Sequence, residues 1–265
     1  MNIVLVSSIT LELANEEDAE ILADISKRAF HSDFEVGAPN KEGGPPGYDS
    51  AEFQFKIFMK WLDYYKILLS SKIVGGLMVK KKKPRHYECQ RIFVDPDYHN
   101  QGIATKAFEI AWKIYADAKI WTLGTPEWNV RTKHFYEKLG FVQVGWTMEA
   151  EWRGRYYEKI MDASQPYVRM KVSELEAGMK DVEIAAKVQE ISESRNVRSK
   201  DSKQLKVAEA TISDGTGSIK LALWNDQIEQ IKFNDKIRIY KGFVTSFRGQ
   251  NQLNVGKYDP LVILL

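Results

Sequence analysis

The sequence predicts two domains, a mixed α/β domain followed by a small all-β barrel. The length of 265 residues suits two domains of ordinary size. Residues 3–161 alternate strand-like runs with stretches of helical periodicity, whereas from residue 182 onward short strand-like runs recur with glycine turns between them. Hydrophobic residues make up 44% and charged residues 28% of the chain, a balance that indicates buried cores and excludes a disordered or collagen-like protein.

A short linker separates the two predicted domains. Residues 163–166 read Ala-Ser-Gln-Pro, which is small, polar and ends in a helix-breaking proline, so we expect domains at 1–163 and 164–265. The net charge of +2 conceals an asymmetry, because residues 165–265 contain 16 basic and 13 acidic side chains while the preceding part is almost neutral. Nucleic-acid binding, if present, is therefore expected to be local to the C-terminal domain.

Targeting signals and metal-binding patterns are weak in this sequence. The charge-free run 1–11 is too short for a membrane span and lacks the features of a secretory signal, so we expect a cytoplasmic protein that starts near Met1 and has no membrane partner. Cys89 is the single cysteine, which excludes an internal disulfide and a zinc site with two thiolates. His31, His86 and His134 lack metal-ligand spacing, so no metal is expected.

Periodicity and turn residues place the elements of the first domain in order. A strand is expected within residues 3–13, and Asn15 precedes an acidic first turn, which predicts a capped helix over 16–30. A loop rich in glycine and proline follows. Further helices are expected at 51–62, 102–116 and 130–139, and further strands at 66–70, 73–79, 87–94, 120–123, 141–147 and 156–161. The four lysines Lys80 to Lys83 are interpreted as a solvated turn between two antiparallel strands, and Cys89 as facing the core.

A strand, a turn and a helix start lie within residues 92–105. Gly102 and Ala104 are small residues two apart, which lets backbone amides face outward where the helix begins. The free N–H groups and the dipole of a helix N-terminus suit a pyrophosphate, although an ordinary strand-to-helix turn is an equally good reading of this spacing alone.

Two signatures make residues 3–161 resemble the GNAT superfamily of acetyl-CoA-dependent N-acetyltransferases. The segment His99-Asn100-Gln101-Gly102-Ile103-Ala104 is similar to the family's Q/R-x-x-G-x-G/A loop, with His99 where Gln or Arg is usual. Asn129 followed by Phe135-Tyr136-Glu137-Lys138-Leu139-Gly140-Phe141 resembles the second signature. The resemblance implies a central mixed, largely antiparallel sheet and acetyl-CoA as the cofactor.

The resemblance also implies roles for individual residues. Tyr136 matches the family's usual general acid, the alternative being a packing role, and Glu88 matches a catalytic base, the alternative being a solvent-facing carboxylate with an ordered water in its place. Direct transfer is expected rather than an acetyl-cysteine intermediate at Cys89. The residues implied to bind the cofactor are Ile92, Phe93, Val94, His99, Asn100, Gln101, Gly102, Ile103, Ala104, Thr105 and Asn129.

Five short strands are expected in the second domain, and together they suggest a small closed barrel. Turns at Asp214-Gly215 and Arg248-Gly249 separate some of them, and residues 228–231 form a short link. The expected strands are 182–189, 204–213, 218–224, 235–246 and 252–255.

Aromatic rings and cations alternate on the third and fourth of these strands. A ring can stack on any base and a cation can pair with any phosphate, so this combination suits a single-stranded nucleic acid. The alternative is that the rings fill the barrel core. The candidate nucleic-acid-binding residues are Trp224, Phe243, Phe247, Lys220, Lys241 and Arg248.

Residues 167–260 resemble the OB-fold single-stranded-DNA-binding proteins of archaea and their eukaryotic relatives. The motifs that carry the resemblance are Asp214-x-x-Gly217-x-Ile219, Leu223-Trp224 and Gly242-Phe243-x-x-x-Phe247. It implies that Trp224, Phe243 and Phe247 stack on bases, with Phe243 where archaeal members often have tryptophan. The chain ends without such a family's flexible tail, and we expect its apolar last residues, 260–265, to pack on the first domain or on a second subunit.

Three functions follow from these observations. The first is a nucleoid-associated N-acetyltransferase that binds single-stranded DNA or RNA and acetylates a lysine or N-terminal amine of a nearby protein. The second is a nucleic-acid-binding protein with an inactive acetyltransferase module. The third is a small-molecule enzyme, for example a polyamine acetyltransferase, whose barrel closes the active site or builds a homodimer; acidic residues Glu35, Glu42 and Asp49 suit a cationic acceptor.

Overall fold

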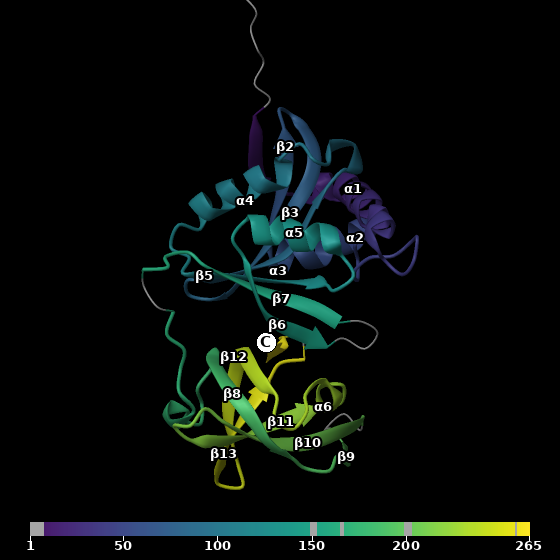
Figure 1. The fold of residues 1–265 in the computed structure, drawn as a ribbon. Coiled ribbons are helices and arrows are strands. Elements are labelled where there is room, and N and C mark those ends of the chain that lie inside the picture. Colours follow the sequence, from purple (N-terminus) through teal and green to yellow (C-terminus); the bar gives the residue numbers. More distant parts are fainter. Residues whose placement is uncertain (1–7, 149–152, 165–166, 199–202, 258) are drawn as a thin grey trace, which may run out of the picture. The chain divides into compact units, whose positions relative to one another are not determined.

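A computed structural model describes residues 8–148, 153–164, 167–198, 203–257 and 259–265. The chain forms two compact units, and their boundary does not simply follow the chain. The first unit contains residues up to 123 together with 128–142 and 158–162, and the second contains 124–127, 143–157 and 163–265. Residues 3–7 of the first predicted strand and residues 165–166 of the predicted linker lie outside the described part. Figure 1 shows the elements of each unit.

The first unit begins with a strand and a capped helix, as the sequence predicts. Strand β1 (Ile9–Leu13) precedes a short 3-10 turn, η1 (Glu16–Asp18), and helix α1 (Ala19–His31). The Asn15 side chain accepts a hydrogen bond from the amide of Glu17, and the Asp18 carboxylate accepts one from the amide of Asn15. This reciprocal arrangement is a capping box, which satisfies amides that have no partner at a helix start.

The sheet of the first unit is an antiparallel meander with one parallel strand added. Strands β2 (Asp63–Leu69), β3 (Lys72–Lys83) and β4 (His86–Val94) pair in sequence order, and β1 pairs with β2. Strand β5 (Ile120–Pro126) joins β4 in parallel. The mixed, largely antiparallel sheet is thereby confirmed.

Helices cover both faces of this sheet (Figure 1). One face carries α1 and a broken helix whose middle is a π-helical segment: α2 (Ala51–Phe53), η3 (Gln54–Phe58) and α3 (Met59–Trp61). The other face carries α4 (Ile103–Ile114) and α5 (Val130–Lys138). A 3-10 turn, η2 (Ser32–Val36), follows α1. No helix in the described ranges is both long and apolar enough to cross a membrane.

The prediction of a solvated lysine turn is wrong. The four lysines belong to strand β3, and the turn that follows consists of residues 84–85. Lys82 is only 3% exposed and its ammonium lies 3.1 Å from the Glu88 carboxylate. The register of β3 and β4 shifts between Lys81 and Lys83, and such a bulge turns a side chain from one face to the other. The ion pair with Glu88 offsets the cost of burying the Lys82 ammonium.

The barrel of the second unit closes through five strands in the order β8, β10, β11, β13, β12 and back to β8. Every contact is antiparallel except that between β11 and β13. These strands are β8 (Val182–Ile191), β10 (Gln204–Ser213), β11 (Ser218–Trp224), β12 (Lys236–Phe247) and β13 (Gln250–Val255). This closed five-stranded barrel is consistent with an OB fold, as predicted. A strand that we did not expect, β9 (Arg195–Arg198), pairs with β10, and a helical turn, α6 (Gln227–Gln230), occupies the predicted link.

The interior of the barrel follows the two-residue period of its strands. Leu221 and Leu223 of β11, Val244 of β12 and Leu253 of β13 all belong to one buried cluster. Alternate residues of a strand point to opposite faces. The residues directly before and after each of these four along its strand therefore point out of the barrel.

The last strand extends this unit beyond the barrel. Strand β14 (Leu261–Leu264) pairs with β12 on one side and with β6 (Val142–Met148) on the other, and β6 also neighbours β7 (Arg153–Ile160). We expected residues 260–265 to pack on the first domain or on a second subunit; β14 pairs with β6, which lies within the predicted first domain 1–163 but belongs to the second compact unit, and with β12 of the barrel. Gly145 permits the close approach, because a Cβ there would stand 2.1 Å from the carbonyl oxygen of Ile263.

We expect Gly145→Ala to lower the free energy of unfolding by about 1–3 kcal/mol, since a methyl group forced against a backbone carbonyl strains the β6–β14 pair. Denaturant unfolding followed by tryptophan fluorescence measures the change. Gly43→Ala is the matched control, because a Cβ at Gly43 meets nothing within 4 Å. Equal stability of the two variants would show that β14 does not depend on this contact.

Candidate functional site

Strands β4 and β5 pair over only three residues of each strand and then separate. Pairing joins His86 to Ile120, Tyr87 to Trp121 and Glu88 to Thr122, and stops there, although both strands continue. A register shift opposite Gln90 bends β4 at this point. Beyond Glu88, the β5-facing edge of β4 has no strand partner within the described residues.

The register of β4 shows which backbone groups this open edge presents. The amide of Asp95 donates to the carbonyl of Val74, which makes that pair a hydrogen-bonded one in the antiparallel ladder. Hydrogen-bonded and non-bonded pairs alternate in such a ladder, so the backbone groups of Ile92 and Val94 point away from β3 and toward the gap. An unpaired strand edge of this kind can bind an extended, amide-containing chain such as pantetheine.

The turn after β4 leads directly into helix α4. Asn100 and Gly102 both have positive φ angles, 61° and 75°, and α4 begins at the next residue, Ile103. A Cβ on Gly102 would meet nothing within 4 Å, so the space beside this helix start is open. The first amides of α4 have no partner inside the helix, and together with the helix dipole they suit a pyrophosphate. The chain thus fits both the pantetheine and the pyrophosphate of CoA.

His99 has a role that the sequence did not reveal. Its Nε2 lies 2.9 Å from the carbonyl oxygen of Val94, and its Nδ1 lies 3.4 Å from a guanidinium nitrogen of Arg131. Arginine can only donate, so we assign Nδ1 as the acceptor and Nε2 as the protonated nitrogen that donates to Val94. The imidazole therefore turns back to β4, and the Val94 carbonyl is already engaged.

A partly buried carboxylate completes the network behind His99. Arg131 donates to Asp33 at 2.5 Å, and the nearby side chain of Asn129 also favours the charged form of this carboxylate and so lowers its pKa. Burial raises the pKa of Asp33, and the charge of Arg131 is the largest of the effects that lower it again. Asn129 also caps α5, since its Oδ1 accepts from the amide of Thr132 at 3.0 Å. Its polar atoms are thus engaged within the protein, and its cofactor role stays a prediction.

Glu88 is not a solvent-facing carboxylate. It is 7% exposed and forms the ion pair with Lys82 described above, at the point where β4 and β5 separate. Thr122, its partner on β5, receives a contact of 2.9 Å from Nε2 of His86. Glu88 therefore lies at the base of the gap with one carboxylate oxygen beside an ammonium, while its role as a base stays a prediction.

Tyr136 projects from α5 into an aromatic cluster. Its ring makes edge contacts with Phe108 at 6.3 Å and Phe141 at 5.9 Å between centroids, and the residue is 6% exposed. These contacts fix the ring plane, so the packing role is real. A fixed ring also orients its hydroxyl, and the general-acid role stays a prediction.

The three aromatic residues of the second unit lie outside the barrel core. Trp224 is 37% exposed, Phe243 40% and Phe247 44%, and none belongs to the buried cluster. The alternative in which these rings fill the core is therefore wrong. Phe247 comes four positions after Phe243 along β12, a distance of about 13 Å in a strand.

Register places these rings on one outer face, which also carries polar side chains. Ala222 of β11, Asn254 of β13 and Phe243 form one row, and Lys220, Gln252 and Thr245 form the next. Lys220 donates to Thr211 at 2.7 Å, and the guanidinium of Arg248 lies 5.3 Å from the Phe247 ring. Lys241 is half-buried on β12. The outer face of β11, β13 and β12 is thus a surface of exposed rings flanked by cations.

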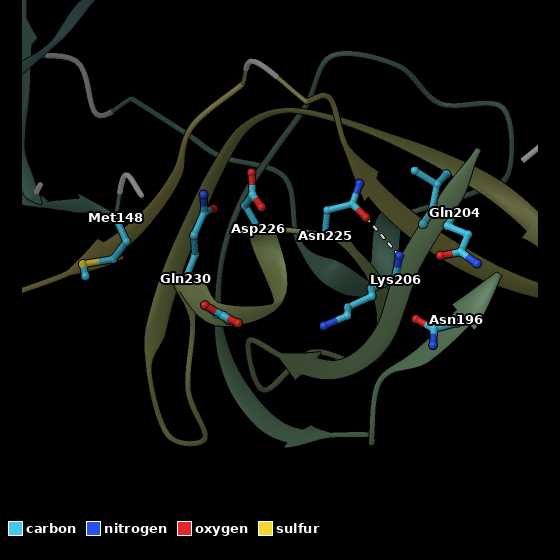
Figure 2. A pocket seen from close by; sticks show the side chains of 9 residues that line it. Met148, Asn196, Gln204, Lys206, Asn225, Asp226 and Gln230 are labelled. Atoms are coloured by element: carbon cyan, nitrogen blue, oxygen red, sulfur yellow. Dashed lines mark hydrogen bonds between the residues drawn. The ribbon is translucent and has the colours of Figure 1, made fainter. Parts of the chain in front are cut away.

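A separate pocket of about 750 Å³ lies elsewhere in the second unit (Figure 2). None of the residues that the sequence singles out lines it. Its side chains are mainly polar, and the amide of Lys206 donates to Asn225 at 2.9 Å across one wall. The lining residues are Met148, Asn196, Gln204, Leu205, Lys206, Asn225, Asp226, Glu229 and Gln230. Among the described residues, no group of three or more histidine, cysteine or acidic side chains is placed to bind a metal.

Comparison with known families agrees with both predicted folds. The model of the acetyltransferase (GNAT) family matches residues 29–141, and that of the Ssb-like single-stranded DNA-binding protein, OB fold, matches residues 175–261. These matches define an acetyltransferase domain joined to an OB-fold domain. The chain belongs to the GNAT acetyltransferase family and carries an Ssb-like OB fold in its C-terminal part.

Individual relatives match one part of the chain or the other. The single-stranded DNA binding protein Ssb of Saccharolobus solfataricus is 36% identical over 86 residues, 32% of this chain, and the chain spans only 57% of that relative's length. The uncharacterized protein YrkN of Bacillus subtilis is 30% identical over 135 residues, which are 50% of this chain and 72% of YrkN. A solved structure of the PaiA N-acetyltransferase of Thermoplasma acidophilum in complex with coenzyme A is 17% identical, with a TM-score of 0.46 over 58% of this chain and 99% of that one.

We expect Arg131→Gln to raise the pKa of Asp33 further above its ordinary value of 3.8, because the charge that opposes burial is lost. A carboxyl with a raised pKa contributes stability at low pH that is lost as the pH rises through that pKa, so this loss should reach higher pH in the variant. NMR titration of the Asp33 carboxyl and unfolding between pH 3 and 7 measure both effects.

At neutral pH, Arg131→Gln should lower the free energy of unfolding by about 1.5–3 kcal/mol, which is the usual contribution of a hydrogen bond to a charged group. Lys56→Gln, which breaks the exposed Glu52–Lys56 pair, is the control and should leave Asp33 unchanged. An Asp33 titration that stays in place or moves to lower pH in Arg131→Gln would contradict the assigned network.

Proposed function

We propose that the protein transfers the acetyl group of acetyl-CoA directly to an amine of another protein, a lysine side chain or an N-terminus, while its OB domain binds single-stranded nucleic acid in the cytoplasm. The observation that carries the transferase proposal is the open edge of β4 beside the start of α4. The three exposed rings on one face of the barrel support the binding proposal.

The chain's own backbone groups position the cofactor in this proposal. The amide and carbonyl of Ile92 and the amide of Val94 orient the pantetheine arm, since His99 already engages the Val94 carbonyl. The amides of residues 101–105 bind the pyrophosphate. His99 and Arg131 act indirectly, because they fix the turn that joins the two sets of groups.

Two side chains then move protons. Acetyl-CoA, when bound, supplies the thioester carbonyl. The attacking amine must be neutral and the departing sulfur must gain a proton, so a base and an acid are needed on either side of the carbonyl. Glu88, directly or through an ordered water, accepts the proton of the amine as the C–N bond forms. Tyr136 donates its hydroxyl proton to the sulfur as the C–S bond breaks.

We expect Tyr136→Phe to lower kcat for acetyl transfer by about 10²–10⁴-fold, the usual contribution of a general acid, with little change in KM for acetyl-CoA. Release of free CoA, assayed with lysine peptides, measures the rate. The ring contacts with Phe108 and Phe141 survive this substitution, so the fold should be retained. Tyr115→Phe, which removes a buried hydroxyl bound to Asp63, is the control. An unchanged kcat in Tyr136→Phe would exclude Tyr136 as the acid.

We expect alanine at Trp224, Phe243 or Phe247 to weaken binding of an oligothymidylate by about 1–3 kcal/mol each, the usual effect of losing one ring that stacks on a base. Fluorescence anisotropy of a labelled oligonucleotide measures the affinity. Trp61→Ala is the control, because Trp61 is 77% exposed but lies in the first unit. Binding that ignores salt and survives the triple substitution would contradict the nucleic-acid proposal.

The two activities are linked in the proposal, so a lysine peptide attached to an oligothymidylate should be acetylated faster than the same peptide alone. Tethering raises the effective concentration of the acceptor. The triple alanine variant should lose this advantage and keep its rate on the unattached peptide. No acetylation of any amine by a chain that still binds the oligonucleotide would favour the inactive-module function.

A second candidate function is a polyamine acetyltransferase whose OB domain is structural or dimer-forming. One observation favours it: burial raises the pKa of Tyr48, and the negative charges of Asp49 and Glu42 raise it further, which indicates a negative potential at this loop. Spermidine in the CoA-release assay distinguishes the candidates. A rate on spermidine that exceeds the rate on peptides, unaffected by oligonucleotide, would replace the first proposal.

A further inference from the structure

The polar pocket of the second unit has no part in the function proposed above. Its volume of about 750 Å³ lies within the range of about 300–1,000 Å³ that is usual for ligand pockets, so it can hold a nucleotide. Leu205 and Met148 are the apolar members of its lining, and the other lining side chains are polar. A ligand of this pocket must therefore offer many hydrogen-bonding groups.

One wall of the pocket is the two-stranded ribbon of β9 and β10 (Figure 2). Asn196 of β9 pairs with Lys206 of β10, and Arg198 pairs with Gln204. Cross-strand partners project to the same side of a ribbon, and the two pairs are two residues apart, so all four side chains share one face. Three of them line the pocket, namely Asn196, Gln204 and Lys206. The strand register thus supports the same wall that the pocket lining defines.

The other wall consists of the turn after β11 and the helical turn α6, and hydrogen bonds fix it to the ribbon. The Asn225 amide donates to the Lys206 carbonyl at 3.0 Å, and the Asn225 side chain accepts from the Lys206 amide at 2.9 Å. The Trp224 amide donates to the side chain of Gln227, a buried residue of α6, at 3.1 Å. The two walls are therefore held in place before a ligand binds.

Both signs of charge line the pocket without neutralising each other. Lys206 lies on the ribbon, and Asp226 and Glu229 lie at α6. None of these three side chains forms a hydrogen bond or an ion pair with another described residue. An ammonium donor and carboxylate acceptors thus remain available to a ligand. Because two carboxylates accompany one lysine, the pocket favours a neutral polar group over a phosphate.

The pocket begins where the face of exposed rings ends. Trp224, one of these rings, is the last residue of β11, and the next two residues, Asn225 and Asp226, line the pocket. Consecutive Cα atoms are about 3.8 Å apart, so the nucleotide next to one that stacks on Trp224 can reach the pocket. Arg198 is exposed on the ribbon face that carries Gln204, where its charge suits the phosphate of this nucleotide.

Hydrogen-bonding groups distinguish the bases at such a site. Carboxylates only accept hydrogen bonds, so they favour a base with an amino group, which thymine lacks. Lysine only donates, and its usual partners on a base are O6 and N7 of guanine. Guanine presents these two acceptors together with a 2-amino donor. It therefore matches a pocket with Lys206 on one wall and with Asp226 and Glu229 on the other.

We propose that this pocket binds one base of the single strand and selects guanine, with Lys206 donating to O6 and N7 and Asp226 or Glu229 accepting from the 2-amino group. The proposal rests on the nucleic-acid binding proposed above and adds a base preference to it. Stacking on the exposed rings tolerates any base, whereas the hydrogen bonds of the pocket discriminate between bases.

Fluorescence anisotropy with the full chain tests the proposal by comparing a labelled oligothymidylate with the same strand carrying one central guanine. The guanine strand should bind about 5- to 100-fold tighter, the usual discrimination of a specific base contact. Inosine, which lacks the 2-amino group, and 7-deazaguanine, which lacks N7, should each lose part of this gain. Equal affinity for the thymine and guanine strands overturns the proposal.

Two variants assign the preference to the pocket. Lys206→Met should abolish the gain from guanine, and so should Asp226→Ala combined with Glu229→Ala, which should not weaken binding of oligothymidylate. The Asp226 side chain makes no capping hydrogen bond to α6, so its removal should leave this turn intact. Glu176→Gln changes an exposed carboxylate outside the pocket and should keep the preference. A guanine preference that survives both pocket variants would overturn the assignment.

Calorimetry with guanosine and thymidine monophosphates separates failure of this inference from failure of strand binding. If no oligonucleotide binds but the guanosine nucleotide binds better than the thymidine nucleotide, and Lys206→Met removes the difference, the pocket stands and the strand-binding proposal fails. If no oligonucleotide binds and the two nucleotides do not differ, both proposals are overturned. If strands bind equally whatever their bases, only the pocket proposal fails.

Discussion

The early end of pairing between β4 and β5 is the constraint on which the first unit depends. Backbone amides and carbonyls need partners, and a strand that leaves a neighbour before its own end must find them elsewhere. Between Glu88 and Val94 this edge of β4 has no strand partner among the described residues, and of its backbone groups the Val94 carbonyl contacts His99. The same residues lead into the turn at Gly102, so the groups suited to two parts of one cofactor come from a single short segment.

In the second unit, strand geometry explains why the aromatic rings are exposed. Closing a small barrel requires every strand to contribute apolar residues inward, and the two-residue period then forces the alternate residues outward. Leu223 and Val244 point into the core, and their neighbours Trp224 and Phe243 are therefore exposed at the surface. Large exposed rings are unfavourable in a protein that has no use for them, which is why their clustering on one face argues for a binding role.

Much of the fold can be predicted from local sequence patterns. The features that could not be predicted depend on contacts between residues that are distant in the sequence. Helical periodicity, the cap at Asn15 and alternation in the barrel strands are readable because they depend on neighbours in sequence. The burial of Lys82 depends on a register shift and on Glu88 across the hairpin. The orientation of the His99 side chain toward β4 depends on Arg131, which lies 32 residues further along the chain. No local sequence pattern predicts this contact. The candidate site residues themselves were found through resemblance to family motifs.

The pairing of β14 with β6 has a consequence for how the protein can be divided. A chain cut at the predicted linker, after residue 164, would keep β6 in the first fragment and β14 in the second, so each fragment would gain an unpaired strand edge. Exposed edges of this kind pair with other chains and promote aggregation. Neither fragment would therefore contain all of the strands that pair with one another in the second unit.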